Sequence, residues 1–138
     1  METKPALLNL ISRYSLEPIE LILEGKADAL RQLAAILEQP ASSPYHLNRP
    51  DHSPSPYTGF LEILQIIQTD TPLRVKRQEN KLLIIGSEIQ FMNLAHQVQS
   101  LANESERISP RLRPHFHVEY YEGSEDVMAD SDPFVVSA

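Results

Sequence analysis

The sequence predicts a single α+β domain, a two-layer sandwich in which two helices cover one face of a mainly antiparallel sheet. Three observations lead to this fold. The chain of 138 residues has the length of one domain. Segments with strand and helix periodicity alternate along it, and one such arrangement occurs twice, at a spacing of 61 residues. The copies, at about 16–69 and 77–137, predict a fold built from a duplicated β-α-β-β unit.

The repeat is clearest in a strand that ends at a glycine and in the helix after it. Residues 21–25 align with residues 82–86, and each of these ranges ends at a glycine. In both copies a proline and a histidine-containing strand follow the helix, at 44–47 and 114–118. Each copy alone is too short for an ordinary domain, so the two copies are expected to share one core.

Residues 6–11 form an apolar run ahead of the first copy and are expected to be a short amphipathic helix. Apolar residues alternate along 16–25, which predicts a strand that ends at a glycine. Along 27–39 they recur at helical spacing, and Pro40 ends this helix. The apolar stripe of the helix should therefore lie on the sheet.

A stretch rich in prolines extends from Pro40 to Gly59, which predicts a mobile loop that contains one short strand at 45–47. The next strand is expected at 60–69. The turn residues 70–72 then lead into an extra strand at 73–76, and a tight connection joins that strand to the second copy.

The second copy repeats the strand and the helix and ends with two further strands, at 115–118 and 134–136. Ser87 and Gln90 have the spacing of a capping box, in which both side chains bond to free backbone amides at the start of a helix. The apolar stripe of this helix consists of Phe91, Leu94, Ala95, Val98 and Ala102.

The composition excludes several classes of function. The 12 basic and 19 acidic residues give a net charge of −7, which argues against nonspecific nucleic-acid binding, because phosphates are neutralised by lysine and arginine. A basic protein partner is electrostatically favoured. The absence of cysteine excludes disulfides, thiolate nucleophiles and cysteine-ligated zinc. No apolar run is long enough to span a membrane, and we expect a cytoplasmic protein.

No motif of the sequence predicts catalysis. Asp51, His52 and Ser53 include the residue types of a hydrolase triad, but triad members are rarely adjacent in sequence, and no nucleophile elbow is present. These three residues are better explained as turn residues. The four glycines lack the spacing of a phosphate-binding loop. We therefore expect a protein without enzymatic activity, catalytic residues or a cofactor.

The strand that begins at residue 115 has two chemically different faces. His115 and His117 share one face because side chains alternate along a strand. Phe116, Val118 and Tyr120 share the other face, which is expected to belong to the core. By the same alternation, the histidine of the corresponding strand in the first copy points outward.

These histidines favour an alternative function, a metal-binding protein or a metal-dependent enzyme. His115 and His117 have a spacing that can chelate zinc or nickel, and His46 or Glu119 could supply a third ligand. Polar residues are equally what the open face of an antiparallel strand requires. The structural interpretation is therefore the stronger of the two, and no metal site is expected.

An acidic stretch follows the second histidine-containing strand. Its candidate partner-binding residues are Glu122, Glu125, Asp126, Asp130 and Asp132. The spacing lacks the alternating ligands and final glutamate of a calcium-binding EF-hand loop. Such charge runs are usually solvated loops. As a functional surface, the stretch is expected to be an electronegative patch that docks a basic protein partner.

Two strand segments, 61–67 and 82–85, are apolar on both faces. A sheet face that stays apolar on the side away from the helices needs cover. Either the N-terminal helix or a second copy of the chain would provide it, and the second arrangement predicts a homodimer.

From residue 82 onward the chain resembles the immunity protein 32 family of bacterial polymorphic toxin systems. The resemblance rests on the strand ending at Gly86, the helix containing Leu94-Ala95, the strand 116–120 and the final segment 132–136. It covers about residues 82–136 and, in weaker form, 19–67. It implies a protein that binds and neutralises a bacterial toxin, and the net charge of −7 makes a basic toxin domain the expected partner. The family supplies no catalytic residues, so the expected function is that of a non-enzymatic protein-binding module.

Overall fold

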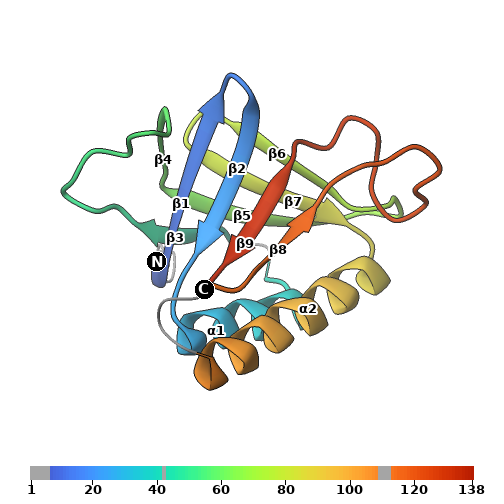
Figure 1. The fold of residues 1–138 in the computed structure, drawn as a ribbon. Coiled ribbons are helices and arrows are strands. Elements are labelled where there is room, and N and C mark those ends of the chain that lie inside the picture. Colours follow the sequence, from blue (N-terminus) through green and yellow to red (C-terminus); the bar gives the residue numbers. More distant parts are fainter. Residues whose placement is uncertain (1–6, 42, 109–112) are drawn as a thin grey trace, which may run out of the picture.

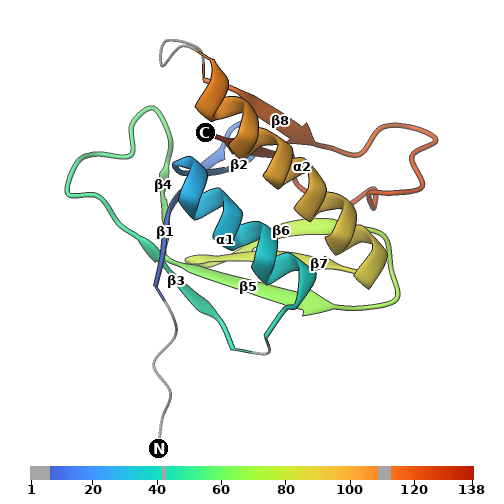
Figure 2. The ribbon, with the colours of Figure 1, turned by 90° about the horizontal axis from the view of Figure 1, so that it is seen from below.

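The computed structural model of the protein describes residues 7–41, 43–108 and 113–138. The α+β class predicted from the sequence is confirmed, since these residues form one curled, mixed sheet and two helices. The sheet curves above the two helices, which lie side by side beneath it (Figure 1). Seen from below, both helices cover the same side of the sheet (Figure 2).

The elements of the described residues are, in chain order, β1 (Leu7–Leu16), β2 (Ile19–Glu24), α1 (Ala27–Glu38), β3 (Tyr45–Asn48), β4 (Gly59–Leu61), β5 (Ile63–Gln68), β6 (Arg74–Gln78), β7 (Lys81–Gly86), α2 (Glu88–Arg107), β8 (His115–Val118) and β9 (Phe134–Ser137). The strand order in the sheet is β6-β7-β5-β3-β1-β2-β9-β8, and β4 pairs with β1. Three of the strand pairs, β1–β3, β2–β9 and β5–β7, are parallel. Among the described strands the other five pairs are antiparallel, so the sheet is mixed and most of its pairs run in the direction that the sequence predicted.

One core lies between the inner face of the sheet and the helices. The apolar stripes predicted for α1 and α2 are buried there, with Leu30, Phe91 and Ala95 at most 1% exposed. Ser87 caps α2, since its Oγ accepts a hydrogen bond from the Gln90 backbone amide at 3.3 Å. The curl also brings β6 across to β1, where the Arg77 guanidinium lies 4.4 Å from the centroid of the Tyr14 ring.

The expected N-terminal helix at residues 6–11 is wrong for the residues that the structure describes, because β1 begins at Leu7. Leu8 and Leu10 are buried, whereas Leu7 and Asn9 are exposed. This alternation suits a strand, and β1 pairs with three others. The strand expected at 60–69 is divided at Glu62 into β4 and β5, which pair with β1 and with β3 and β7, respectively.

The C-terminal end of the proline-rich stretch, at Tyr57 and Thr58, is hydrogen-bonded to the β1–β2 hairpin. The Thr58 amide donates to the Tyr14 carbonyl at 2.8 Å, and the Tyr57 hydroxyl donates to the Glu20 carboxylate at 3.5 Å. Partial burial, and secondarily the negative charge of Glu20, raise the pKa of the Tyr57 phenol. The neutral phenol is therefore the form that suits this contact.

This contact predicts an alkaline pH dependence of stability. Because the folded-state pKa of Tyr57 lies above its unfolded value of about 10, its contribution is fully present below that value and is lost as the pH rises through the folded pKa. We expect Glu20→Gln to lower the pKa of Tyr57 and Glu17→Gln to leave it unchanged. The pKa is measured by following phenolate absorbance as the pH rises, and the titration curve of Tyr57→Phe is subtracted to isolate the signal of Tyr57. Equal pKa changes in the two glutamine variants would contradict the contact with Glu20.

Candidate functional site

The segment between β8 and β9 lies along the free edge of β6 and closes the curl of the sheet (Figure 1). The Leu73 amide donates to the Asp126 carbonyl at 2.8 Å, and the Met128 amide donates to the Leu73 carbonyl at 2.9 Å. Further along, the Asp132 amide donates to the Val75 carbonyl at 2.9 Å. Backbone groups that an edge strand would leave unpaired are thereby satisfied.

Side chains strengthen this attachment. Lys76 Nζ lies 3.3 Å from the Asp132 carboxylate and donates to the Asp130 carbonyl at 3.0 Å. Arg74 pairs with the Asp130 carboxylate at 3.1 Å. Ser131 Oγ accepts a hydrogen bond from the Val75 amide at 2.9 Å. We call this set of contacts from β6 to residues 130–132 the clamp.

The five acidic residues predicted to bind a partner therefore occupy different environments. Asp130 and Asp132 belong to the clamp and are neutralised within the chain. Asp126 accepts a 3.4 Å hydrogen bond from Gln90 of α2. Glu122 and Glu125 are exposed and form no ion pair with any residue that the structure describes. Among the described residues, these two are therefore the carboxylates of the five that have neither an ion pair nor a side-chain hydrogen bond.

We define the tip as residues 120–125, which project beyond the clamp. Tyr121 is 68% exposed and Tyr120 is 41% exposed, although the sequence placed Tyr120 in the core. That expectation was wrong because β8 ends at Val118, so the alternation of faces does not extend to Tyr120. The Ser124 amide donates to the Tyr121 carbonyl at 2.9 Å, which folds the tip into a turn.

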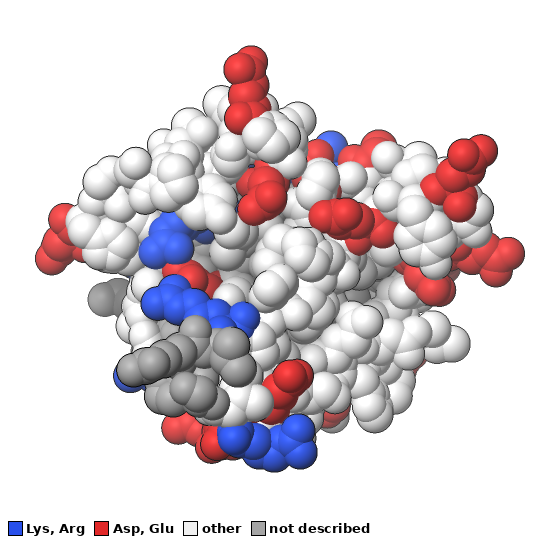
Figure 3. All heavy atoms as spheres, in the orientation of Figure 1, with Lys and Arg blue, Asp and Glu red and all other residues white. Residues whose placement is uncertain are grey.

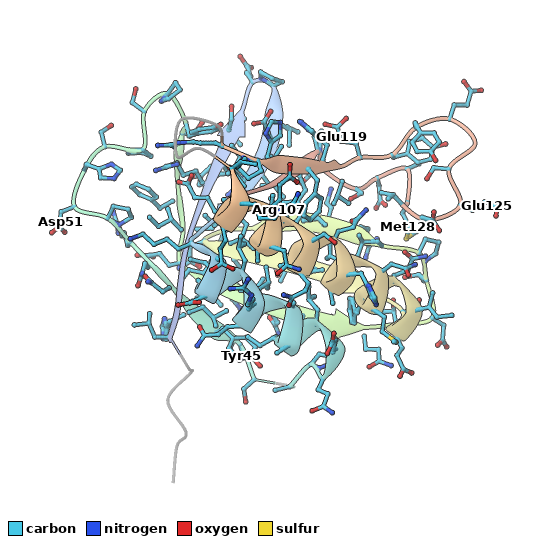
Figure 4. All side chains as sticks on the ribbon, turned by 60° about the horizontal axis from the view of Figure 1, so that its bottom comes forward. Tyr45, Asp51, Arg107, Glu119, Glu125 and Met128 are labelled. Atoms are coloured by element: carbon cyan, nitrogen blue, oxygen red, sulfur yellow. The ribbon has the colours of Figure 1, made fainter. Side chains whose placement is uncertain are left out.

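Acidic side chains gather over the tip on the face drawn in Figure 3. Glu125 lies at the outer end of the loop, away from the helices (Figure 4). At the turn, Gly123 has a φ of 89°, a left-handed conformation that glycine adopts without strain. The tip thus offers two aromatic rings and two free carboxylates on a turn that the clamp holds in place.

The histidines lie on the outer face of the sheet but form two separate groups. The rings of His115 and His117 are 5.2 Å apart, and His117 Nδ1 is 3.4 Å from a Glu119 oxygen. His46 is on β3, which β9, β2 and β1 separate from β8 in the sheet. Within the described ranges, no three His, Cys, Asp or Glu side chains are grouped so as to hold a metal ion.

The residues of the rejected triad interpretation lie in the proline-rich loop. His52 Nδ1 is 2.9 Å from the neighbouring Ser53 carbonyl, and the His52 ring packs edge-on against Phe60 at 6.0 Å. These contacts are local to the loop and to β4. His96 is exposed on α2.

Sequence reasoning missed the basic half of the clamp, Arg74 and Lys76, and also the hydroxyl of Ser131 on the acidic segment. A signal was present, because Arg74 and Lys76 are two residues apart on one strand and Asp130 and Asp132 have the same spacing. Matching spacings of opposite charge suit two adjacent extended segments.

No protein-family model matches the sequence. Neither the curated proteins nor the solved structures include a chain that matches it. Of the helices that the structure describes, none has the length and apolar character needed to cross a membrane.

Proposed function

We propose that this protein is a non-enzymatic protein-binding module that uses the tip of the β8–β9 loop to bind a basic partner. The observation that carries the proposal is the combination of exposed Tyr120 and Tyr121 with the unpaired Glu122 and Glu125. Tyrosine is enriched among the residues that dominate binding energy at protein interfaces, because its ring buries a large area at small entropic cost.

The charges supply the second part of recognition. Free carboxylates beside the aromatic rings attract a positive surface and accelerate its association. The overall net charge of −7 acts in the same direction at longer range. The clamp contributes by holding the tip before the partner arrives, which lowers the entropy lost on binding. An immunity-type inhibitor of a bacterial toxin, cytoplasmic and active by covering its target, fits this description and the sequence resemblance.

A gene for a basic toxin domain beside this protein's gene would support the proposal, and the association rate with that domain is the test. We expect Glu122→Lys/Glu125→Lys to slow association at least tenfold at low salt, with a smaller effect at high salt. Glu17→Lys/Glu38→Lys is the matched control, since it changes the net charge equally at two exposed positions outside the tip. Equal slowing by both double variants would show that only net charge matters and would refute the proposal that the tip binds the partner.

The alternative is a His-based metal protein. It is supported by the close approach of His115 and His117 and by Glu119 beside His117, whereas His46 lies near Glu62 on another part of the sheet. Within the described residues, Glu119 is not grouped with the two histidines so as to hold a metal ion, and two imidazoles alone make a weaker site than the three or four ligands of a typical zinc centre. Stoichiometric zinc or nickel in the purified protein would favour this alternative over the binding module.

We also propose that the chain contains a duplicated unit. The strand pairs support this, because the last strand of each predicted copy pairs in parallel with the first strand of the other copy. These pairs are β9 with β2 and β5 with β7. The hairpins β1–β2 and β6–β7 precede α1 and α2 in the same way. The homodimer and the two-layer arrangement remain proposals, and light scattering would test the first.

A further inference from the structure

A cavity of 340 Å³ lies between α2 and the β8–β9 loop. One wall is formed by three amide side chains of α2, from Gln90, Asn93 and Gln97. Amide groups at this spacing follow one face of a helix. They present carbonyl oxygens that accept hydrogen bonds and NH₂ groups that donate them. This volume is within the range of small-ligand sites.

The opposite wall carries negative charge. It includes the carboxylates of Glu119 and Asp126. His117 also lines the cavity, with its Nδ1 3.4 Å from a Glu119 oxygen, and no lysine or arginine lines it among the described residues. Ser124 also lines the cavity, and its Oγ is buried with no hydrogen-bond partner among the residues that the structure describes. A buried hydroxyl without a partner is costly unless a ligand or water completes it. Tyr121, which is 68% exposed, also lines the cavity.

We propose that this cavity receives the guanidinium group of an arginine side chain from the partner. The inference rests on the proposed function and extends it to one contact. A guanidinium carries five donors in a plane and no acceptor, which matches a cavity with two carboxylates, amide oxygens and an unpaired hydroxyl. Tyr121 would cover the flat face of the group through a cation–π contact. A lysine ammonium would satisfy fewer of these acceptors, because its charge is compact.

The test needs no partner protein. Nα-acetyl-arginine amide is titrated into the isotope-labelled chain, and the backbone amides of α2 and of residues 119–127 are followed by NMR. We expect saturable shifts there, with a dissociation constant on the order of 1 mM, as for a single side chain. The uncharged isostere Nα-acetyl-citrulline amide and Nα-acetyl-lysine amide should each bind about tenfold more weakly.

Variants locate the binding. Asp126→Asn and Glu119→Gln should each weaken arginine binding by about tenfold. Ser124→Val should also weaken it, because it replaces the unpaired hydroxyl with apolar surface and breaks no hydrogen bond within the described residues. Glu104→Gln is the matched control, a loss of one carboxylate on α2 outside the cavity. Equal binding of the citrulline or lysine amide, or unchanged binding by Ser124→Val in a protein with a native melting temperature, would overturn the proposal. The tip could still bind a partner in that case, since Glu122→Lys/Glu125→Lys tests it separately.

Discussion

Truncation of Phe134 to alanine is expected to lower the free energy of unfolding by about 3–5 kcal/mol. Phe134 is fully buried and begins β9, the strand that lies between β2 and β8. Its Cα partners are Leu21 on one side and Val118 on the other, both buried as well. Removing the ring would leave a cavity at the junction of three strands, where the surrounding backbone has little freedom to collapse.

Val135→Ala is the matched control, because Val135 is the next residue of β9 and faces the outer side of the sheet at 8% exposure. We expect it to cost about 1–2 kcal/mol, from the smaller apolar surface that is lost. Urea denaturation with linear extrapolation measures both changes. Similar losses for the two variants would mean that β9 does not direct alternate side chains into and out of the core.

The helices and the helix cap could be predicted from the sequence because they depend on residues that are close together in it. The apolar stripe of α2 and the cap at Ser87 depend on residues a few positions apart, and both are present in the structure. The run from Leu7 to Ile11 contains both patterns in part, so periodicity alone could not decide between helix and strand. Pairing decides it, because β1 gains partners on both sides from β2, β3 and β4.

The arrangement of the sheet could not be predicted, since it depends on residues far apart in sequence. Leu21 pairs with Phe134 across more than a hundred residues, and no local pattern specifies that contact. The tip was predicted as part of a uniformly free acidic loop. That hypothesis did not include the edge strand β6, whose side chains Arg74 and Lys76 form ion pairs with Asp130 and Asp132. The sequence identified the charged segment, but the fold is needed to distinguish the carboxylates that pair with β6 from those that stay free.

The second large effect that we expect is a loss of stability when the clamp is opened. Ser131→Ala/Asp132→Ala should lower the free energy of unfolding by about 2–3 kcal/mol. Most of this loss comes from the Val75 amide, which belongs to a fully buried residue and would lose its 2.9 Å hydrogen bond to Ser131 Oγ. The Lys76–Asp132 pair is partly exposed, so its loss adds less.

Asp130→Asn is the control for the clamp, since it breaks only the more exposed pair with Arg74 and should cost less than about 1 kcal/mol. Urea denaturation gives the stability losses, and amide hydrogen exchange at Val75 and Met128 reports the opening of the segment. Unchanged exchange in the double variant would mean that the backbone hydrogen bonds to β6 hold the segment without the side chains.

The same double variant links the clamp to binding. Its tip keeps Tyr120, Tyr121, Glu122 and Glu125, but a released loop has to be ordered again when the partner binds. Ordering a residue costs about 1–2 kcal/mol of conformational entropy, so even two released residues predict at least a tenfold loss of affinity. Because the tip charges are intact, the loss should be nearly independent of salt, unlike that of Glu122→Lys/Glu125→Lys. Wild-type affinity in a variant whose loop exchanges freely would show that the clamp serves stability alone.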